Sequence, residues 1–257
     1  MPADTFRTLL LGDVYSDSGV RVVFFRLKEL IKKYKADFVI ANGENACGGY
    51  GLGVTDMYKL FESGVDVITS GNHIWQQEEI IPYLDSQDRL LRPANYPSSV
   101  PGRGFTIYKD VAVINLQGRT NMPATDDPFR CASDIVRKVK NTAKLIFVDF
   151  HAESSEEKEA LGLYLDGNVS CVAGTHIHVQ TADEHILNGQ TAYITDLGMC
   201  GPADSVIGCD IQTAIKRQKT QMPLKTVSAE GNAVIQGVLV TCNRETGKAV
   251  SIERICG

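Results

Sequence analysis

Residues 169–178 read Val-Ser-Cys-Val-Ala-Gly-Thr-His-Ile-His, an apolar run of strand length that ends in two histidines. Four earlier runs have the same design, because each is followed directly by residue types that can bind a metal. These run ends are Gly12-Asp13, Asn42-Gly43-Glu44-Asn45, Gly71-Asn72-His73 and His151-Ala152-Glu153. In open α/β sheets, side chains beyond the carboxyl ends of the strands meet at one edge. The pattern therefore predicts an α/β fold with a metal site at that edge.

Segments with helical periodicity separate the runs. Apolar residues recur at three- and four-residue steps from Val20 to about Tyr34, which indicates an amphipathic helix. We expect further helices at about 55–63, 132–140 and 155–165. We expect strands at about 38–42, 65–69, 144–149 and 169–173, and a hairpin formed by 105–108 and 111–116.

The C-terminal part has a different pattern. Residues 191–195, 233–241 and 248–255 look like strands, with no comparable helices between them. This predicts β-rich structure that closes onto a βαβ core. No internal repeat, low-complexity tract or Pro/Ser-rich linker occurs, so we expect one domain over residues 1–257. The loop from Gln117 to Arg130 is longer than typical connections, which fits a functional loop, a surface excursion or a subunit contact equally well.

The composition is that of a soluble globular protein, with 43% hydrophobic and 22% charged residues. A net charge of -5 without a long basic run disfavours binding to long nucleic acids, but a small anionic substrate stays compatible if metals supply positive charge. The start Met1-Pro2-Ala3-Asp4 lacks signal-peptide features, and no apolar run approaches the ~18 residues of a membrane span. We therefore expect a cytoplasmic protein without a membrane partner. Its seven scattered cysteines, with no Cys-x-x-Cys pair, are expected to be reduced thiols.

The pair His176-Ile177-His178 is the most specific signal. In an extended segment, alternate side chains face the same way at a spacing of roughly 6.6 Å, so the two imidazoles could serve adjacent metal ions. In Asn72-His73, one residue could bind a metal while the other faces the substrate, although a lone Asn-His pair is more often a turn. His151 taken alone could be an ordinary buried histidine. Asp149 could orient His151 or simply form buried hydrogen bonds.

Asp13 and Glu44 offer the anionic oxygens that a divalent cation needs. Asp13 could instead cap the helix that follows it, and Glu44 could belong to a turn. Capping does not explain the whole combination of Asp, Glu, Asn and several His at the ends of strand-like runs. The combination predicts two metal ions with mixed nitrogen and oxygen ligands, at the separation of ~3.5–4 Å used in phosphoryl-transfer and hydrolytic sites. The glycines of 48–53 match neither nucleotide-binding glycine motif, so we interpret this segment as a flexible turn beside the site.

The ordered set Gly-Asp, Gly-Glu-Asn, Gly-Asn-His, His-Ala-Glu and Gly-Thr-His-x-His resembles the calcineurin-like metallophosphoesterase superfamily. More closely, it resembles the YmdB family of bacterial phosphodiesterases. The superfamily usually begins with Asp-x-His, whereas here Tyr15 stands in the third place, and Glu44 replaces the usual Asp of the second motif. The resemblance also extends to segments outside the ligand motifs, at 92–95, 115–120, 126–129, 179–183 and 194–199.

This resemblance implies a β-sandwich flanked by helices, with a dinuclear site at the carboxyl-terminal edge of the strands. It assigns His73 as the proton donor. It implies two divalent or transition-metal ions, with iron as the first choice and manganese or zinc as alternatives. The implied ligands of the first metal are Asp13, Glu44, Asn45 and His178, and those of the second are Glu44, Asn72, His151 and His176.

The implied function is hydrolysis of cyclic mononucleotides, including 2′,3′-cyclic forms, by a metal-bridging hydroxide. Two alternatives stay open at this point. One is a phosphomonoesterase or nuclease on the same site, and the other is a regulator that binds a metal-held nucleotide without turnover. We also expect a homo-oligomer.

Overall fold

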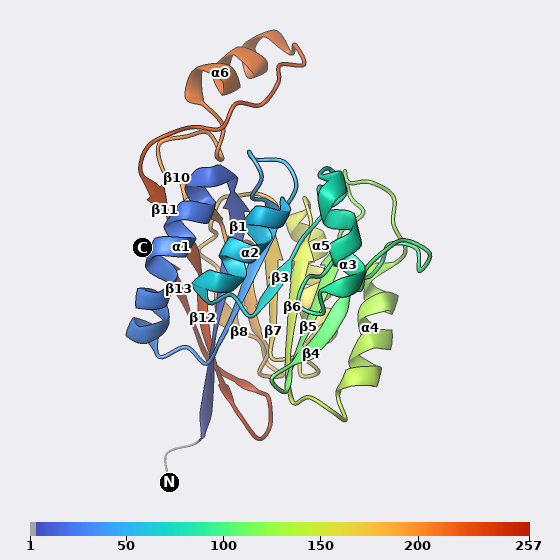
Figure 1. Ribbon diagram of the computed structural model, residues 1–257. Helices are drawn as coiled ribbons and strands as arrows, with labels where there is room; N and C mark the ends of the chain where they lie inside the picture. Colours follow the sequence, from blue (N-terminus) through green and yellow to red (C-terminus); the bar gives the residue numbers. More distant parts are fainter. Residues whose placement is uncertain (1–3) are drawn as a thin grey trace.

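Two β-sheets pack face to face, with helices on their outer surfaces (Figure 1). The computed structural model describes residues 4–257. Residues 1–3, at the start that lacks signal-peptide features, lie outside the described residues.

The first sheet is built around the long strand β1. One edge of β1 pairs in parallel with β2, which in turn pairs with β3. The other edge pairs with β12 in antiparallel fashion and, near the carboxyl end of β1, with β10 in parallel. The sheet has seven strands, β1 (Thr5–Tyr15), β2 (Phe38–Asn45), β3 (Val67–Thr69), β10 (Met199–Pro202), β11 (Ala233–Val234), β12 (Gln236–Asn243) and β13 (Ala249–Cys256).

The second sheet has the strand order β4-β5-β6-β7-β9-β8. Its four inner strands run parallel, and an antiparallel strand lies at each edge. The carboxyl ends of the inner strands therefore share one edge. The six strands are β4 (Phe105–Tyr108), β5 (Val111–Gln117), β6 (Leu145–His151), β7 (Cys171–Thr175), β8 (His185–Ile186) and β9 (Ala192–Ile194).

Each sheet is covered on its outer face by helices. Helices α1 (Ser16–Tyr34) and α2 (Val54–Ser63) pack on the first sheet, and α4 (Pro128–Val139) and α5 (Ser155–Leu165) pack on the second. A short 3-10 turn, η1 (Glu78–Ile80), leads into α3 (Ile81–Ser86) beside α2. No helix within residues 4–257 is both long and apolar enough to cross a membrane.

The apolar runs of the strands create three buried layers. Leu9 and Leu11 point toward the helices of the first sheet, whereas Leu10 between them points toward the second sheet. Val113 faces the first sheet, and its neighbour Ile114 faces α4 and α5. Strands buried on both faces need apolar residues at every position, which explains the continuous runs in the sequence. The predicted metallophosphoesterase-type fold, a β-sandwich flanked by helices, is confirmed.

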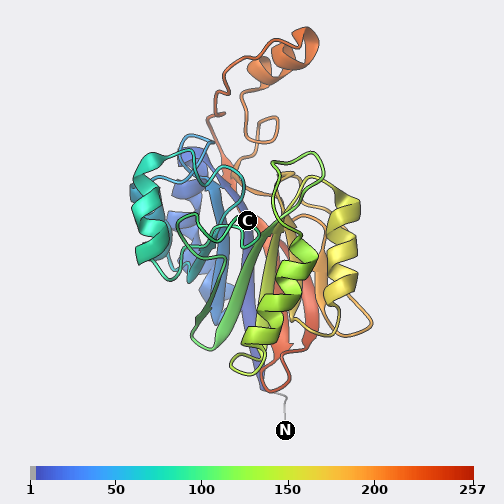
Figure 2. The same cartoon turned by 90° about the vertical axis from the view of Figure 1, so that its right-hand side faces the viewer.

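The prediction that the C-terminal part lacks helices is wrong. Helix α6 (Ile211–Thr220) lies between β10 and β11, in a segment that stands clear of both sheets (Figures 1 and 2). We call this segment, residues 203–232, the arm. Only Ala214 of α6 is buried. Ile211, Ala214 and Ile215 do stand at helical spacing, but they cover little more than one turn, which is too short a pattern to identify a helix. A second signal is Asp210, whose side chain accepts a hydrogen bond from the Thr213 N–H at 2.8 Å.

The predicted loop 117–130 is also shorter than expected. Helix α4 begins at Pro128, because the Asp127 side chain caps it by accepting a hydrogen bond from the Phe129 N–H at 2.9 Å. The loop therefore ends at residue 127. Asp127 and Pro128 mark this boundary in the sequence, whereas hydrophobic periodicity does not show where the first turn begins.

Candidate metal centre and active site

The predicted site residues gather at the carboxyl ends of the strands of both sheets. Asp13 lies in β1, Glu44 and Asn45 end β2, and His151 ends β6. His176 and His178 follow β7. The turn Gly71-Asn72-His73 follows β3 and contacts Glu44, because the His73 N–H donates to Glu44 Oε2 at 3.0 Å. The structure thus brings all eight predicted residues to one edge.

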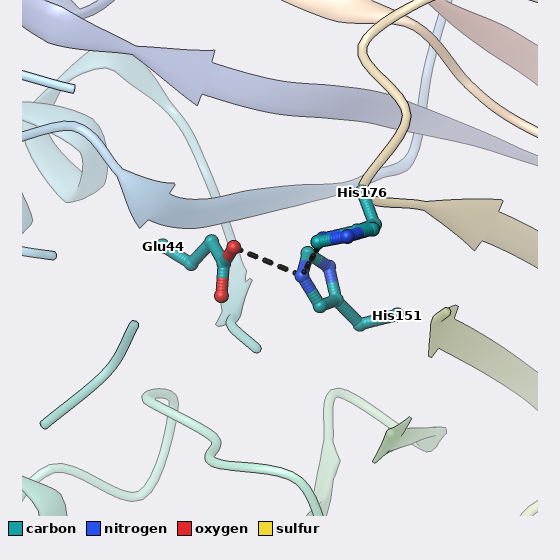
Figure 3. A group of neighbouring side chains, drawn as sticks. All are labelled: Glu44, His151 and His176. Atoms are coloured by element: carbon teal, nitrogen blue, oxygen red, sulfur yellow. Dashed lines mark hydrogen bonds and ion pairs between the residues drawn. The ribbon is translucent and has the colours of Figure 1, made fainter. Parts of the chain in front are cut away.

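A first ligand group consists of Glu44, His151 and His176 (Figure 3). Glu44 Oε1 lies 2.9 Å from His151 Nε2, and His176 Nδ1 lies 3.0 Å from the same nitrogen. One ligand atom from each residue lies within 4.8 Å of the others. Glu44 and His151 are fully buried. These three atoms have the chemistry and spacing for one metal ion.

A second ligand group surrounds the Asn45 amide. Asn45 Nδ2 lies 3.1 Å from His178 Nε2, 3.5 Å from Asp13 Oδ1 and 3.4 Å from Glu44 Oε1. The two ends of an amide are nearly isosteric, so a half turn about its terminal bond would present Oδ1 to the same position. Glu44 contacts members of both groups, which fits a bridging carboxylate.

Each metal-facing histidine has its second ring nitrogen occupied. His151 Nδ1 lies 2.9 Å from Thr175 Oγ1, and His176 Nε2 lies 3.0 Å from Glu153 Oε2. His178 Nδ1 lies 2.9 Å from the carbonyl oxygen of Ile207 in the arm. Such outer partners fix the ring orientation and leave the other nitrogen for a metal. These partners were not predicted as site residues, although Glu153 and Thr175 stand inside the ligand motifs.

Asp149 supports this arrangement through a buried polar network. Its carboxylate accepts hydrogen bonds from Thr175 Oγ1 at 2.7 Å, from Asn42 Nδ2 at 3.0 Å and from the Thr69 hydroxyl. Both roles considered for Asp149 are therefore combined, since it forms buried hydrogen bonds and orients His151 through Thr175. Burial raises the pKa of Asp149 to about 6.

Asn72 supplies a test of whether the residues fit a metal. Its side-chain oxygen Oδ1 is buried and has no hydrogen-bond partner within the described residues. A buried acceptor without a donor is unfavourable unless a cation or a water satisfies it. Together with the three ring nitrogens that face the two ligand groups and with two buried carboxylates, this acceptor fits a divalent cation.

The electrostatics of the site point to the same ligand. Burial alone would raise the pKa of Asp13, but the hydrogen bond and charge of His178 lower it well below its usual range. Burial likewise opposes ionisation of Glu44, and the charge and hydrogen bond of His151 lower its pKa. Both carboxylates are therefore negative although no solvent reaches them, with protonated histidines as their cationic partners. A divalent cation could take over that role when these histidines are neutral.

Two details of the sequence analysis are wrong. His176 and His178 do not lie on an extended segment, because their φ angles are 103° and 67°. They still serve separate groups, since His176 faces His151 while His178 faces Asp13. Asp13 is not a helix cap either, because Tyr15 holds that position without a side-chain bond.

A cavity of about 500 Å³ opens onto the ligand groups. Tyr50 of the glycine-rich segment lines it beside His73, with ring centroids 4.3 Å apart, so that segment does lie beside the site. The arm forms the facing wall, with Ile207 and Arg217 among its lining residues. The site therefore has a floor of candidate metal ligands and a wall contributed by a separate part of the chain.

Comparisons with known proteins agree with this geometry. The chain matches the family model described as YmdB-like protein over residues 9–255. It is 48% identical to a 2′,3′-cyclic-nucleotide 2′-phosphodiesterase of Bacillus subtilis (strain 168), covering 97% of this chain and 96% of the relative.

Two crystal structures are also similar to it. One is a hypothetical protein from Thermus thermophilus, with TM-score 0.90, 37% identity and coverage of 98% and 99%. The other is a novel phosphatase from Mycoplasma pneumoniae, with TM-score 0.92, 34% identity and coverage of 99% and 94%. The predicted class of enzyme, a phosphoric diester hydrolase, is confirmed. The chain belongs to the YmdB-like family.

Proposed function

We propose that this protein is a dinuclear metal-dependent phosphodiesterase that hydrolyses cyclic mononucleotides, including 2′,3′-cyclic forms. One observation carries the proposal: two groups of buried nitrogen and oxygen ligands share Glu44. The name of the Bacillus subtilis relative supports the substrate class.

The first metal would be held by Asp13, Glu44, Asn45 and His178, and the second by Glu44, Asn72, His151 and His176. When bound, divalent ions at these positions supply positive charge to the phosphate oxygens and lower the pKa of a water enough for it to attack phosphorus. Iron is our first choice, and manganese or zinc are alternatives, because these ligand types suit all three.

The charges of the chain's own residues favour an anionic phosphodiester. Asp13 and Glu44 contribute two negative charges, whereas the Asn and neutral His ligands contribute none. By formal counting, about two positive charges remain in a site loaded with two divalent ions. A phosphodiester that carries one negative charge suits this field.

His73 would protonate the departing alkoxide. Its Nδ1 lies 2.8 Å from the Asn45 amide atom placed as Oδ1. When Asn45 turns its Oδ1 to the metal, the amide nitrogen takes this place and donates to Nδ1, so the ring proton lies on Nε2, which is free to reach the substrate. The side chain is partly exposed to the cavity, as a residue that meets the substrate must be. General acid catalysis of this kind contributes typically ~10²–10⁴-fold.

Substitution of Glu44 tests the dinuclear arrangement. Glu44→Gln keeps the size of the side chain but removes the charge, and an amide bridges two cations poorly. We expect wild type to hold about two metal ions per chain and the variant to lose metal from both positions together. Hydrolysis of bis-p-nitrophenyl phosphate should be lost with the metal. Elemental analysis and a cyclic-nucleotide panel measure both effects. Glu156→Gln, at an exposed position in α5, is the matched control. Full occupancy and near-normal turnover in Glu44→Gln would refute the bridging role.

The rival activity of a phosphomonoesterase is tested with the same preparation. The name of the Mycoplasma pneumoniae structure, a novel phosphatase, favours it as the second candidate. We expect the wild-type protein to hydrolyse bis-p-nitrophenyl phosphate much faster than p-nitrophenyl phosphate. The opposite preference would favour the monoesterase.

A further inference from the structure

Arg217 on helix α6 faces the cavity from the wall opposite the metal ligands. The side chain is half-buried, and its two hydrogen bonds go to neutral groups of the arm, Cys209 Sγ at 3.1 Å and Thr226 Oγ1 at 3.4 Å. Arg217 forms no ion pair with a carboxylate of the described residues. The arginines that do form ion pairs within residues 4–257 are Arg103, Arg119, Arg137, Arg244 and Arg254.

A half-buried guanidinium without a carboxylate partner can bind an anion in the cavity that it lines. Arginine has five N–H donors in a rigid fork that matches a phosphate or carboxylate. Here its side-chain partners within the described residues are a thiol, which is a weak acceptor, and a hydroxyl at the long distance of 3.4 Å. The arrangement leaves donor capacity and a full positive charge directed at whatever fills the cavity.

The metal ligands already account for one phosphate. In a nucleoside 2′,3′-cyclic phosphate, that phosphate lies at one end of the ribose and the 5′ carbon at the other. A substrate whose cyclic phosphate lies on the metal ligands extends its remaining part into the cavity toward the arm. Tyr50, which is 50% exposed beside His73, presents an aromatic ring of the kind on which bases stack. The volume of about 500 Å³ lies within the range of nucleotide-sized pockets.

On the basis of the function proposed above, we infer that Arg217 binds a second phosphate of the substrate, carried on the ribose 5′ oxygen. The preferred substrates are then cyclic nucleotides with a 5′-phosphate group. This group is either a terminal phosphate on a mononucleotide or the internucleotide phosphate of a short oligonucleotide with a cyclic end. Arg217 is thus a specificity residue that acts at a distance from the reacting phosphorus.

Binding of product analogues tests this role without any need for turnover. Isothermal titration of the metal-loaded enzyme compares adenosine 3′,5′-bisphosphate with adenosine 3′-monophosphate. We expect the wild-type protein to bind the bisphosphate about 10- to 100-fold more tightly, because a charge-assisted hydrogen bond adds a contribution of that size. In Arg217→Gln the ratio of the two dissociation constants should fall to near one.

Lys216→Gln is the matched control. It removes the same charge from the neighbouring position of α6, and Lys216 is exposed and does not line the cavity. This variant should keep the wild-type ratio. Equal binding of the two nucleotides by wild-type protein, a ratio that survives in Arg217→Gln, or an equal loss in Lys216→Gln would each overturn the role of Arg217.

Hydrolysis rates identify the source of the second phosphate. The substrates are adenosine 2′,3′-cyclic phosphate with a 5′-hydroxyl, the same compound with a 5′-phosphate, and a diadenosine dinucleotide with a 2′,3′-cyclic end. We expect Arg217→Gln to lower kcat/KM for one or both of the last two by about 10-fold or more relative to the first. An equal effect on all three contradicts the inference. If wild-type protein hydrolyses none of them, the proposed function fails, while the titration still decides the role of Arg217.

Discussion

Gly71 brings the main chain between two of the proposed ligands. A Cβ at this position would lie 2.1 Å from His151 Cδ2 and 2.2 Å from Glu44 Oε2, well inside contact distance. We therefore predict that Gly71→Ala displaces both ligands and lowers metal content and diesterase activity together, by at least 10-fold in activity. Gly48→Ala is the control, because no atom lies within 4 Å of a Cβ there. Because Gly48 has φ of +59°, the alanine substitution should cost about 1 kcal/mol of unfolding free energy, but the variant should keep its metals. Normal metal content in Gly71→Ala would contradict the geometry.

His73 makes a prediction about leaving groups. His73→Ala should keep the fold and most of the metal but lose ~10²–10⁴-fold in activity on cyclic nucleotides, whose alkoxide leaving group needs a proton. The loss should be much smaller with bis-p-nitrophenyl phosphate, because p-nitrophenolate leaves without protonation. Steady-state kinetics on both substrates measures the difference. Equal losses would indicate that His73 binds the substrate and does not donate a proton.

Asp149 makes a prediction about pH. Burial raises its pKa from 3.8 in the unfolded chain to about 6 in the folded protein, so the folded state holds the proton more tightly. This contribution to stability is fully present below pH 3.8 and is lost as the pH rises through about 6. The size of the shift corresponds to about 3 kcal/mol. We would measure the free energy of unfolding in urea, with a chelator present, for wild type and for Asp149→Asn. Between about pH 4 and 7 the wild type should lose up to that amount of stability relative to the variant, whose amide does not titrate. Parallel pH profiles would show that Asp149 does not titrate in this range.

At this scale the sequence is a good guide to where polar side chains gather and a poor guide to their hydrogen-bond partners. The gathering of the eight candidate residues at one edge was predictable because they stand at or just after the ends of strand-like runs, and carboxyl ends of strands share an edge. Their separate roles rest on the family resemblance. The hydrogen-bond partner of His178 was not predictable. Ile207 acts through its carbonyl oxygen, which every residue possesses, and only the path of the arm brings it to the site.

At the scale of elements, a buried ion pair joins helix α5 to Asp196, which follows β9 and holds the loop that carries His176 and His178. Lys158 Nζ lies 2.7 Å from Asp196 Oδ2, and both side chains are buried. The same carboxylate oxygen accepts the N–H of Ile177, between the two histidines, at 3.1 Å. The pair therefore fixes the path of this loop. Because His176 and His178 have positive φ angles, the loop does not continue the hydrogen-bond ladder of β7.

We predict that Lys158→Met costs about 3–5 kcal/mol in unfolding free energy, because it leaves Asp196 buried without its cation. Metal affinity should fall as well, since the loop loses its anchor. Urea unfolding and metal titration measure the two effects. Lys138→Met on the exposed side of α4 is the control and should change stability by no more than about 0.5 kcal/mol. A loss below about 1 kcal/mol in Lys158→Met would mean that the pair does not hold the loop.

The predictability of elements follows from what each one buries. Helices α1, α2 and α5 and the inner strands were predicted within a few residues, because their apolar faces pack on a sheet. Helix α6 buries only Ala214, and its apolar residues at helical spacing cover little more than one turn, so the pattern was too short to recognise. The segment from 78 to 86, which forms η1 and α3, was missed because nine residues are too few for the helical period to stand out.

At the scale of the whole molecule, the proposed metals connect the two sheets. Asp13 and Glu44 come from the first sheet, and His151 and His176 come from the second. We predict that chelation lowers the unfolding free energy by about 4 kcal/mol relative to protein at free metal about 1,000-fold above the dissociation constant. Thermal or urea unfolding with and without chelator measures this, and Glu44→Gln should show a much smaller difference. If the unfolding midpoint is the same with and without chelator, the metals do not couple the sheets.

The position of the arm separates the residues proposed to hold the metals from those that face the rest of the substrate. The proposed ligands stand at the ends of strands packed between buried layers, so substitutions there act on folding as well as on chemistry. The arm buries little and can vary in length and composition at small thermodynamic cost. Divergence of substrate preference within this architecture can therefore proceed by remodelling helix α6, in which only Ala214 is buried, as a graft onto an unchanged chemical core. Residues 207–209 stay with that core, because the Ile207 carbonyl orients His178, Gly208 packs against Tyr15 and Cys209 is buried.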